Sequence, residues 1–217
     1  MTNSFALEHL TRPSSLKDNA PLIIMLHGYG SDENDLFSFA SELPAEYFIV
    51  SAKAPYRMQP YGNAWYAIHF DSNDGKFNDT EQAIASRELV STFIDQVKAS
   101  YPVDANRVVL LGFSQGTILS LATALSYPEK VQYVVGLSGY LSKDMLLEGY
   151  KQRDFSRLDI YMSHGSVDQV IPVQWARDSQ PKLKELGISV NFSEYPVGHG
   201  VAPANFYHFK SWLEERL

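Results

Sequence analysis

The chain has 217 residues, of which 45% are hydrophobic and 20% are charged, and its formal net charge is −7. This length and composition are typical of one folded domain and argue against long disordered segments. The negative charge repels phosphate backbones, so we expect no nucleic-acid partner. The sequence contains no cysteine, which excludes disulfides, Cys-ligated metals and a thiol nucleophile.

The start of the chain shows no targeting pattern. Residues 1–20 contain neither a long apolar run nor a small-residue cleavage site, so we expect no signal peptide. The apolar run at 22–26 is far too short to span a bilayer. We therefore expect a cytoplasmic protein without stable membrane insertion.

Strand-like and helix-like patterns alternate along the chain. Short continuous apolar runs predict strands that are buried on both faces of a sheet, and apolar residues at helical spacing predict helices. Pro and Gly at segment ends indicate where helices begin or stop. In chain order we expect a strand at 22–26, a helix at 35–43, a strand at 48–51, a long loop at 55–75, a helix at 79–100, a strand at 107–112, a helix at 115–127, strands at 131–137 and 160–163, a helix at 173–186, a strand at 188–195 and a helix at 203–217.

This alternation indicates an α/β fold. Strand–helix–strand units at this spacing form right-handed crossovers, which produce a mainly parallel central sheet with helices on both faces. We find no repeat, linker or low-complexity tract, so we expect a single domain over residues 1–217, without a separate lid domain. The loop at 55–75 is rich in aromatic residues, Gly, Pro and Asn, and loops of this length are usually functional.

The main candidate for a catalytic motif is Gly112-Phe113-Ser114-Gln115-Gly116, which lies between a predicted strand and a predicted helix. A serine nucleophile on a sharp strand-to-helix turn needs glycine two residues before and after it, because side chains there would clash. The helix N-terminus also favours the negative charge that develops in acyl transfer. The pentapeptide alone could arise by chance as a tight turn with an exposed serine, and its strand–helix context favours the nucleophile.

A nucleophilic serine needs a general base, and the base needs an acid that orients it. In a turn of this kind the acid and then the histidine follow the serine along the chain. His199 stands in a glycine-flanked turn after a predicted strand, whereas His164 leaves little room for a preceding acid and His208 lies inside the last helix. Asp168, just after a strand, is the predicted acid. Its rivals lie at surface or helix positions: Asp144, Asp154, Asp159 and Asp178.

Acyl transfer also needs two backbone N–H groups that bind the developing oxyanion. One is predicted to belong to Gln115, the residue after the nucleophile. The other is expected from the loop His27-Gly28-Tyr29-Gly30, after the first strand, through the Tyr29 N–H. Taken alone, this loop would be an ordinary glycine turn.

Other kinds of site fit the sequence poorly, and we expect no cofactor and no metal. A dinucleotide fingerprint that began at Gly28 would need glycine at position 33, which is Glu33. Gly75-Lys76 is followed by Phe77, which excludes a P-loop. The six histidines are scattered and form no His-x-x-x-His pair that could bind zinc.

Taken together, these segments resemble the phospholipase/carboxylesterase family of α/β-hydrolases, which includes lysophospholipases and acyl-protein thioesterases. The match covers nearly the whole chain in the order typical of the family. The resemblance implies the α/β-hydrolase fold, a Ser114–Asp168–His199 triad and an oxyanion hole from Tyr29 and Gln115, and it allows a homodimer. The matching stretches are 26–30, Trp65-Tyr66, 112–116, His164-Gly165-x-x-Asp168-x-x-Ile171-Pro172 and 198–200.

Two positions depart from the family pattern. Family members often carry an acidic residue after the aromatic pair Trp65-Tyr66, where this chain has Ala67, and many have Leu where it has Tyr29. The backbone role of residue 29 survives this change, but the change bears on the acyl pocket. The family's protein-depalmitoylating role is therefore not carried over.

The sequence thus predicts a serine hydrolase that cleaves carboxylic esters or thioesters of short to medium acyl chains, or lysophospholipids, through an acyl-enzyme. Activity is expected to fall at acid pH as His199 is protonated. In the 55–70 part of the loop, Trp65 and Tyr66 either bind substrate along an acyl groove or pack into the core, and the sequence leaves both readings open. The alternatives are an acyl-protein thioesterase and a non-catalytic binding protein of the same fold.

Overall fold

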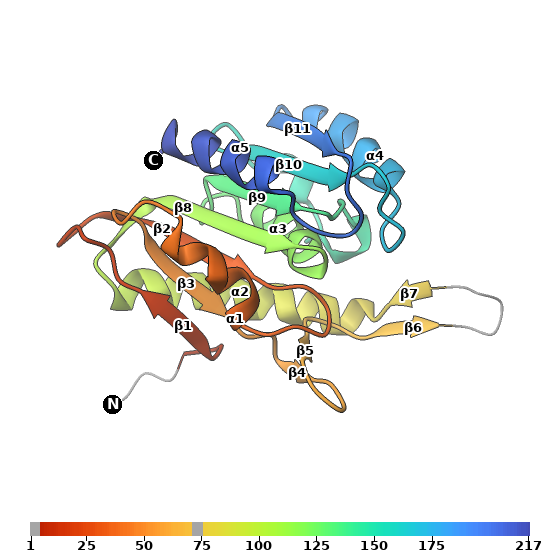
Figure 1. Cartoon of the computed structure of the whole chain (residues 1–217), viewed down its shortest axis with the longest axis horizontal. Helices are drawn as coiled ribbons and strands as arrows, with labels where there is room; N and C mark the ends of the chain where they lie inside the picture. Colours follow the sequence, from red (N-terminus) through yellow and green to blue (C-terminus); the bar gives the residue numbers. More distant parts are fainter. Residues whose placement is uncertain (1–4, 71–75) are drawn as a thin grey trace.

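The structure, a computed structural model, describes residues 5–70 and 76–217. Its centre is a seven-stranded sheet in the order β1-β3-β2-β8-β9-β10-β11 (Figure 1). All neighbouring strands run parallel except the edge pair β1–β3, so the mainly parallel sheet expected from the sequence is confirmed. The strands span β1 (His9–Arg12), β2 (Ala20–Leu26), β3 (Phe48–Ala52), β8 (Val103–Phe113), β9 (Tyr133–Leu137), β10 (Asp159–Gly165) and β11 (Ser189–Tyr195).

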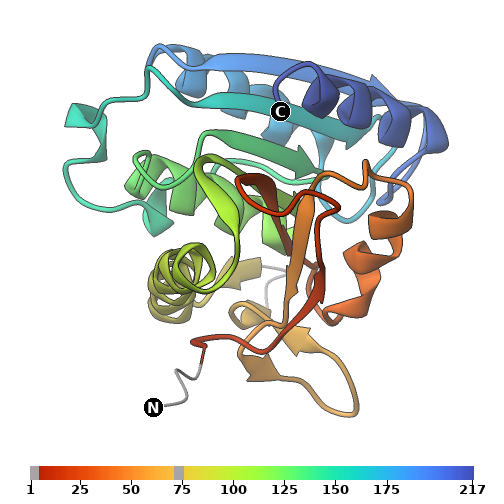
Figure 2. The ribbon, with the colours of Figure 1, turned by 90° about the vertical axis from the view of Figure 1, so that its left-hand side faces the viewer.

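Helices cover both faces of the sheet (Figures 1 and 2). Residues such as Ile24 pack toward α2, α3 and α4 on one face, whereas neighbours such as Ile23 pack toward α1 and α5 on the other. Since side chains alternate along a strand, the sheet divides the core into two layers. The helices span α1 (Asn34–Phe37), α2 (Thr80–Ser100), α3 (Gln115–Ser126), α4 (Val173–Lys184) and α5 (Pro203–Glu214), with 3₁₀ turns η1 (Ser38–Ser41), η2 (Lys143–Met145) and η3 (Tyr150–Gln152).

The central strand β2 shows why such strands are continuously apolar. All seven of its residues are buried, and its aliphatic side chains have no exposed surface. Complete burial of a large aliphatic side chain stabilises the fold by about 1.5–3 kcal/mol. Both faces of β2 therefore hold the strand in place, and with it the loop that follows Leu26.

The edge strand β1 was not predicted. It has only four residues, and none of them is fully buried, so it lacks the apolar run that marks the other strands. Its Arg12 guanidinium donates to the carbonyl oxygens of Leu43, Pro44 and Tyr47 at 2.9, 2.6 and 2.7 Å, and also to that of Ala40. β1 is thus fixed by antiparallel pairing with β3 and by this arginine, and neither contact is visible in a local sequence pattern.

Three predicted helices are at least two residues too long, and the last of them, expected at 203–217, ends at Glu214. The helix expected at 35–43 is the short α1 followed by η1, where the Glu42 N–H donates to the Phe39 carbonyl in the tighter 3₁₀ pattern. The helix expected at 173–186 ends at Lys184, after which Gly187 has a φ of +78°. The Gly187 N–H donates to the Lys184 carbonyl, so glycine serves as the predicted C-terminal cap.

The long loop predicted at 55–75 contains short paired segments. β4 (Tyr56–Arg57) pairs with β5 (Asn63–Ala64), and β6 (Ile68–Phe70) pairs with β7 (Lys76–Asn78). Positions 71–75 of the predicted loop lie outside the described residues. Across the two described ranges, no separate lid domain covers the sheet edge, and no helix is long and apolar enough to cross a membrane.

Candidate active site

The predicted site residues meet at the carboxyl edge of the sheet. The parallel strands β2, β8, β10 and β11 all end at this edge, on the right in Figure 1. Ser114 directly follows β8, Asp168 lies in the loop after β10, and His199 lies in the loop after β11. The loop that contains Tyr29 follows β2. Because the carboxyl ends of parallel strands share one edge, residues far apart in sequence come together there.

Ser114 occupies a strained backbone position between β8 and α3. Its φ of +54° and ψ of −116° are rarely adopted by an L-residue and cost about 1–3 kcal/mol. An added Cβ at Gly112 would overlap the backbone of Gly116, and one at Gly116 would overlap the carbonyl oxygen of Leu26. The glycine spacing is therefore a steric requirement of this turn, as the sequence predicted.

A chain of hydrogen bonds joins three of the predicted residues. His199 Nε2 lies 2.9 Å from Ser114 Oγ, and His199 Nδ1 lies 2.7 Å from Asp168 Oδ2. Because a carboxylate only accepts, Nδ1 carries the proton and Nε2 is free to accept the serine hydroxyl. The arrangement can remove a proton from Ser114 and stabilise the imidazolium that results.

The Asp168 carboxylate is buried, and protein N–H groups bind it through hydrogen bonds. Its Oδ1 accepts the backbone N–H groups of Val170 at 2.8 Å and Ile171 at 3.0 Å. Burial raises the pKa of Asp168, but the hydrogen bonds from His199, Ile171 and Val170 outweigh it, so the net effect lowers this pKa. Asp168 is therefore an anion at neutral pH.

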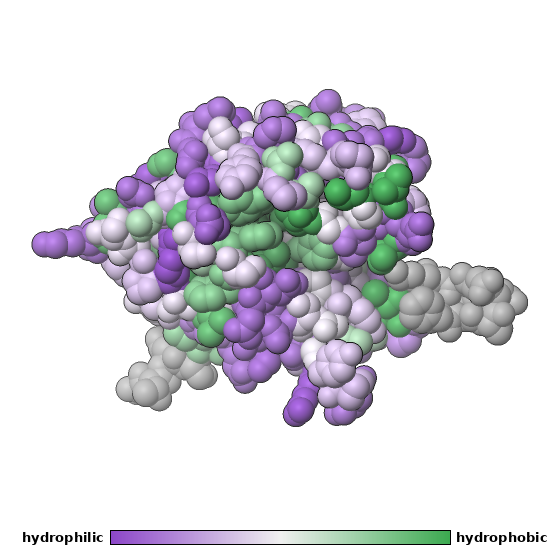
Figure 3. All heavy atoms as spheres, in the orientation of Figure 1, coloured by the Kyte–Doolittle hydropathy of each residue, from purple (hydrophilic) through white to green (hydrophobic). Residues whose placement is uncertain are grey.

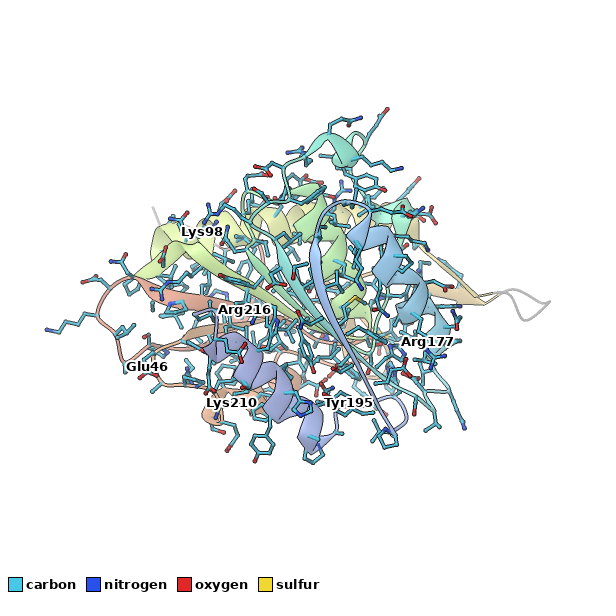
Figure 4. All side chains as sticks on the ribbon, turned by 90° about the horizontal axis from the view of Figure 1, so that it is seen from above. Glu46, Lys98, Arg177, Tyr195, Lys210 and Arg216 are labelled. Carbon is cyan, nitrogen blue, oxygen red and sulfur yellow. The ribbon has the colours of Figure 1, made fainter. Side chains whose placement is uncertain are left out.

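One rival acid, Asp144, lines the cavity beside Ser114, and other rivals lie farther from it. Asp159, at the amino end of β10, pairs with Arg216 at 2.7 Å. His208, on α5, has its Nδ1 2.7 Å from the hydroxyl of Tyr195, which Figure 4 labels at the end of β11. His164 is the exception, because its Nε2 lies 3.3 Å from Asp168 Oδ2. Sequence reasoning missed this contact, although a histidine four residues before the acid at a strand end was the available signal.

The two residues predicted to form the oxyanion hole have backbone N–H groups without a backbone acceptor in the described part of the chain. Gln115 is the first residue of α3, so its N–H has no acceptor one helical turn earlier. In the loop after β2, the Gly30 N–H donates to Asn63 at 2.9 Å, whereas the Tyr29 N–H makes no backbone hydrogen bond within the described part of the chain. Tyr29, Gln115 and Ser114 line the same cavity.

Buried neutral groups support these donors. The Gln115 side chain accepts the Trp65 N–H and donates to the Tyr66 carbonyl, both at 2.8 Å. The Trp65 indole N–H donates to the His27 carbonyl at 2.9 Å. His27 Nε2 accepts the Ala54 N–H at 3.1 Å, and Nδ1 donates to the Gly28 carbonyl at 2.8 Å. These contacts tie the loop after β2 to α3.

The two aromatic candidates for substrate contact are separated in the structure. Trp65 is completely buried and does not line the cavity, in keeping with the alternative of core packing. Tyr66 lines the cavity, although it is only 1% exposed. From the rest of the 55–70 loop, Ile68 also lines the cavity, whereas Tyr61 is 79% exposed and lies at a separate cavity.

The cavity beside Ser114 has a volume of about 720 Å³. Its walls combine apolar and aromatic side chains with a few charges, which suits a substrate with an apolar part. Figure 3 shows hydrophobic patches at this right-hand end of the molecule. In the described part of the chain, no His, Asp and Glu side chains are grouped so that three could hold a metal ion. Residues that line the cavity include Ile118, Tyr140, Lys143, Asp144, Met145, Trp175 and Lys182.

Comparison with known proteins finds one family along nearly the whole chain. The model of the phospholipase/carboxylesterase family matches residues 11–217. Acyl-protein thioesterase 1 of Aspergillus fumigatus is 28% identical over 223 residues, covering 93% of this chain and 90% of that protein. A probable carboxylesterase of Oryza sativa subsp. japonica is 28% identical over 156 residues, which cover 71% of this chain. The match spans only 58% of the length of this rice protein and 59% of a related probable carboxylesterase of Arabidopsis thaliana.

Solved structures share the same architecture. Esterase PE8 is 26% identical with a TM-score of 0.82, covering 97% of this chain and 99% of that one. The carboxylesterase of Bacillus cereus is 18% identical with a TM-score of 0.84, covering 97% and 95%. These likenesses confirm the fold class expected from the sequence.

Proposed function

The chain belongs to the phospholipase/carboxylesterase family of α/β-hydrolases, and on that premise we propose that it hydrolyses carboxylic esters or thioesters with Ser114 as nucleophile. His199 is the general base, and Asp168 is the acid that orients it. The N–H groups of Tyr29 and Gln115 form the oxyanion hole. The observation that carries the proposal is the unbroken hydrogen-bond chain from Ser114 Oγ through His199 to Asp168, with contacts of 2.9 and 2.7 Å.

The proposed reaction has two half-reactions. The Ser114 hydroxyl gives its proton to His199 Nε2 while Oγ attacks the carbonyl carbon, and the displaced electron pair forms an oxyanion held by the Tyr29 and Gln115 N–H groups. The intermediate collapses and expels the alcohol or thiol, which takes the proton from His199. Water then attacks the acyl-enzyme by the same route, releasing a carboxylic acid and restoring Ser114.

The cavity supports a substrate with an acyl chain of short to medium length. Its volume of about 720 Å³ and its apolar walls fit such a chain beside Ser114. Relatives of this chain are named carboxylesterase and acyl-protein thioesterase, so we include both esters and thioesters as candidate substrates. Rates on p-nitrophenyl esters of increasing chain length, acyl thioesters and lysophospholipids would rank them, and we expect the simple esters and thioesters to exceed lysophospholipids.

The decisive experiment is substitution of the nucleophile. We expect Ser114→Ala to abolish acyl-enzyme formation and covalent labelling by a fluorophosphonate probe, with unchanged thermal unfolding. Ser142→Ala is the matched control, because Ser142 lines the same cavity, and it should keep both activity and labelling. A turnover of Ser114→Ala equal to wild type would overturn the proposal. Wild-type protein that is neither labelled nor active would favour the non-catalytic binding protein.

A further inference from the structure

The cavity beside Ser114 has a buried hydroxyl in its wall that the protein itself does not bind. Tyr66 lines this cavity and is only 1% exposed. Its phenol oxygen is buried and makes no hydrogen bond to any of the described residues. Buried polar groups are nearly always paired in native proteins, because leaving one unpaired is costly. A hydroxyl of this kind in a cavity wall is available to a ligand.

The backbone around Tyr66 is held by hydrogen bonds from other elements. The Gln115 amide accepts the N–H of Trp65 and donates to the carbonyl of Tyr66, both at 2.8 Å. On the following side, the Ala67 N–H donates to Gln82 Oε1 at 2.9 Å. The phenol is thus carried by a fixed stretch of chain, so binding a ligand there costs little conformational entropy.

The phenol of Tyr66 is a neutral donor. Burial raises the pKa of Tyr66 well above its usual value, and the nearby Tyr140 adds to this, while the Gln115 amide acts in the opposite direction. Both neighbours also line the cavity, which places the hydroxyl end of the ring on the cavity side. The Tyr140 hydroxyl has its own contact, with the Asn78 amide at 3.5 Å. The Tyr66 O–H is therefore left to donate to an oxygen of a ligand.

The surroundings of this hydroxyl favour an uncharged ligand atom. The neighbours that shift the pKa of Tyr66 are uncharged, whereas the charged residues that line the cavity come from η2 and α4, namely Lys143, Asp144 and Lys182. A buried carboxylate or phosphate would need a paired charge beside it. An ether or ketone oxygen needs only a neutral donor such as this phenol.

We propose that Tyr66 is a specificity-determining residue whose hydroxyl donates to an uncharged oxygen in the acyl chain of the substrate. This rests on the proposed hydrolase function, since it names the substrate class of the same site: esters or thioesters of alkoxy- or keto-acyl groups. Apolar lining residues such as Ile118 and Met145 suit the carbon atoms of such a chain. A site with a hydrogen-bonding group discriminates against an analogue that leaves this group unpaired.

The test moves one ether oxygen along the acyl chain. p-Nitrophenyl pentanoate is compared with p-nitrophenyl ethoxyacetate and β-methoxypropanoate, in which oxygen replaces one methylene group, and matching ethers of the heptanoate extend the scan. For each pair, the ratio of kcat/KM for the ether to that for the alkyl ester is compared between wild type and Tyr66→Phe, which cancels the intrinsic reactivity of the esters. For at least one position of the oxygen we expect this ratio to fall about five- to tenfold, because one hydrogen bond is lost.

Two controls separate this role from others. Tyr61→Phe removes an exposed hydroxyl from the same loop, at a separate cavity, and should leave every ratio unchanged. Tyr66→Phe should unfold at the wild-type temperature or above it, because it removes an unpaired buried hydroxyl. A lower unfolding temperature would mean that the hydroxyl is bound within the protein, and this would overturn the proposal. Ratios that stay at the wild-type value for every ether would overturn it as well.

Ketone analogues of these esters, in which a methylene group replaces the ester oxygen, provide a readout without turnover. We expect an ether ketone to raise the unfolding temperature of wild type more than its alkyl counterpart does, and this difference to disappear in Tyr66→Phe. If wild type hydrolyses no ester but shows this result, the hydrolase proposal fails while the role of Tyr66 as a donor stands. If wild type is an active esterase and the difference persists in Tyr66→Phe, the role of Tyr66 fails alone.

Discussion

The two sides of Ser114 are built in different ways. On the proposed acid–base side, the assigned groups are side chains from the loops after β10 and β11, and one of them, Asp168, is a buried anion. On the proposed oxyanion side, the assigned groups are main-chain N–H groups, and the side chains around them are neutral and buried. One side therefore depends on ionisation and the other on backbone position.

This difference determines how each side responds to change. A single side-chain substitution can delete a group on the acid–base side, because each role belongs to one side chain. On the oxyanion side, most substitutions leave the N–H in place, so only a change that removes or displaces the backbone donor should matter. Three predictions follow this contrast, in order of decreasing expected effect.

The largest effect is expected for Asp168→Asn. The amide keeps an oxygen for the N–H groups of Val170 and Ile171 but removes the negative charge, so the imidazole of His199 loses the partner that fixes its tautomer. In another triad enzyme the same change lowers kcat by about 10⁴. We expect a loss of this order in kcat for ester hydrolysis, with circular dichroism unchanged.

A matched acid supplies the control for this prediction. Asp144 lines the cavity but makes no hydrogen bond to His199 in the described structure. Asp144→Asn should keep kcat within a few-fold of wild type. If the two variants lose equal activity, charge in the cavity rather than orientation of His199 would be the relevant property.

The second prediction deletes a backbone donor. Tyr29→Pro removes the N–H that we assign to the oxyanion hole, and a single lost donor lowers kcat by about 10²–10³ in other enzymes. Tyr29→Ala keeps the N–H and removes only the partly exposed ring, so we expect its kcat to stay near wild type and its KM to rise. Steady-state kinetics on one p-nitrophenyl ester distinguish the two. A proline variant that is folded and fully active would exclude the Tyr29 N–H as a donor.

The same contrast explains what could be predicted from the sequence. The turn around Ser114 has local requirements, namely glycine at two fixed positions between a strand and a helix, and these are visible in the chain. Asp168 and His199 follow from the order of strands, since each must lie after a strand end. The mainly parallel sheet follows from the alternation of strands and helices.

The features that could not be predicted from the sequence depend on contacts between segments that are far apart in the chain. Trp65 has the same aromatic character whether it lines a cavity or packs under a loop, and only its bonds to His27 and Gln115 decide. Much of the cavity wall, such as Tyr140 and Trp175, comes from segments without any motif. The contact of His164 with Asp168 likewise appears only when the loop after β10 is folded.

The smallest predicted effect concerns pH and stability on the oxyanion side. Burial lowers the pKa of His27, so the ring stays neutral in the folded protein while the unfolded chain titrates near pH 6.5. A group whose pKa is lowered by folding contributes stability above the unfolded pKa, and this contribution is lost as the pH falls toward the folded pKa. The free energy of unfolding should therefore decrease below about pH 6.5, by at most about 1.4 kcal/mol per pH unit from this group.

His27→Gln isolates this term, because glutamine does not titrate. Denaturant unfolding at pH 7.5 and pH 5.5 should show a smaller loss of stability in the variant than in wild type. The pKa of Asp168 is also lowered, but its contribution is lost only as the pH falls below about 4, so it cancels between the two proteins in this window. Equal losses in both proteins would mean that His27 takes up a proton in the folded state. The oxyanion side would then depend on ionisation just as the acid–base side does.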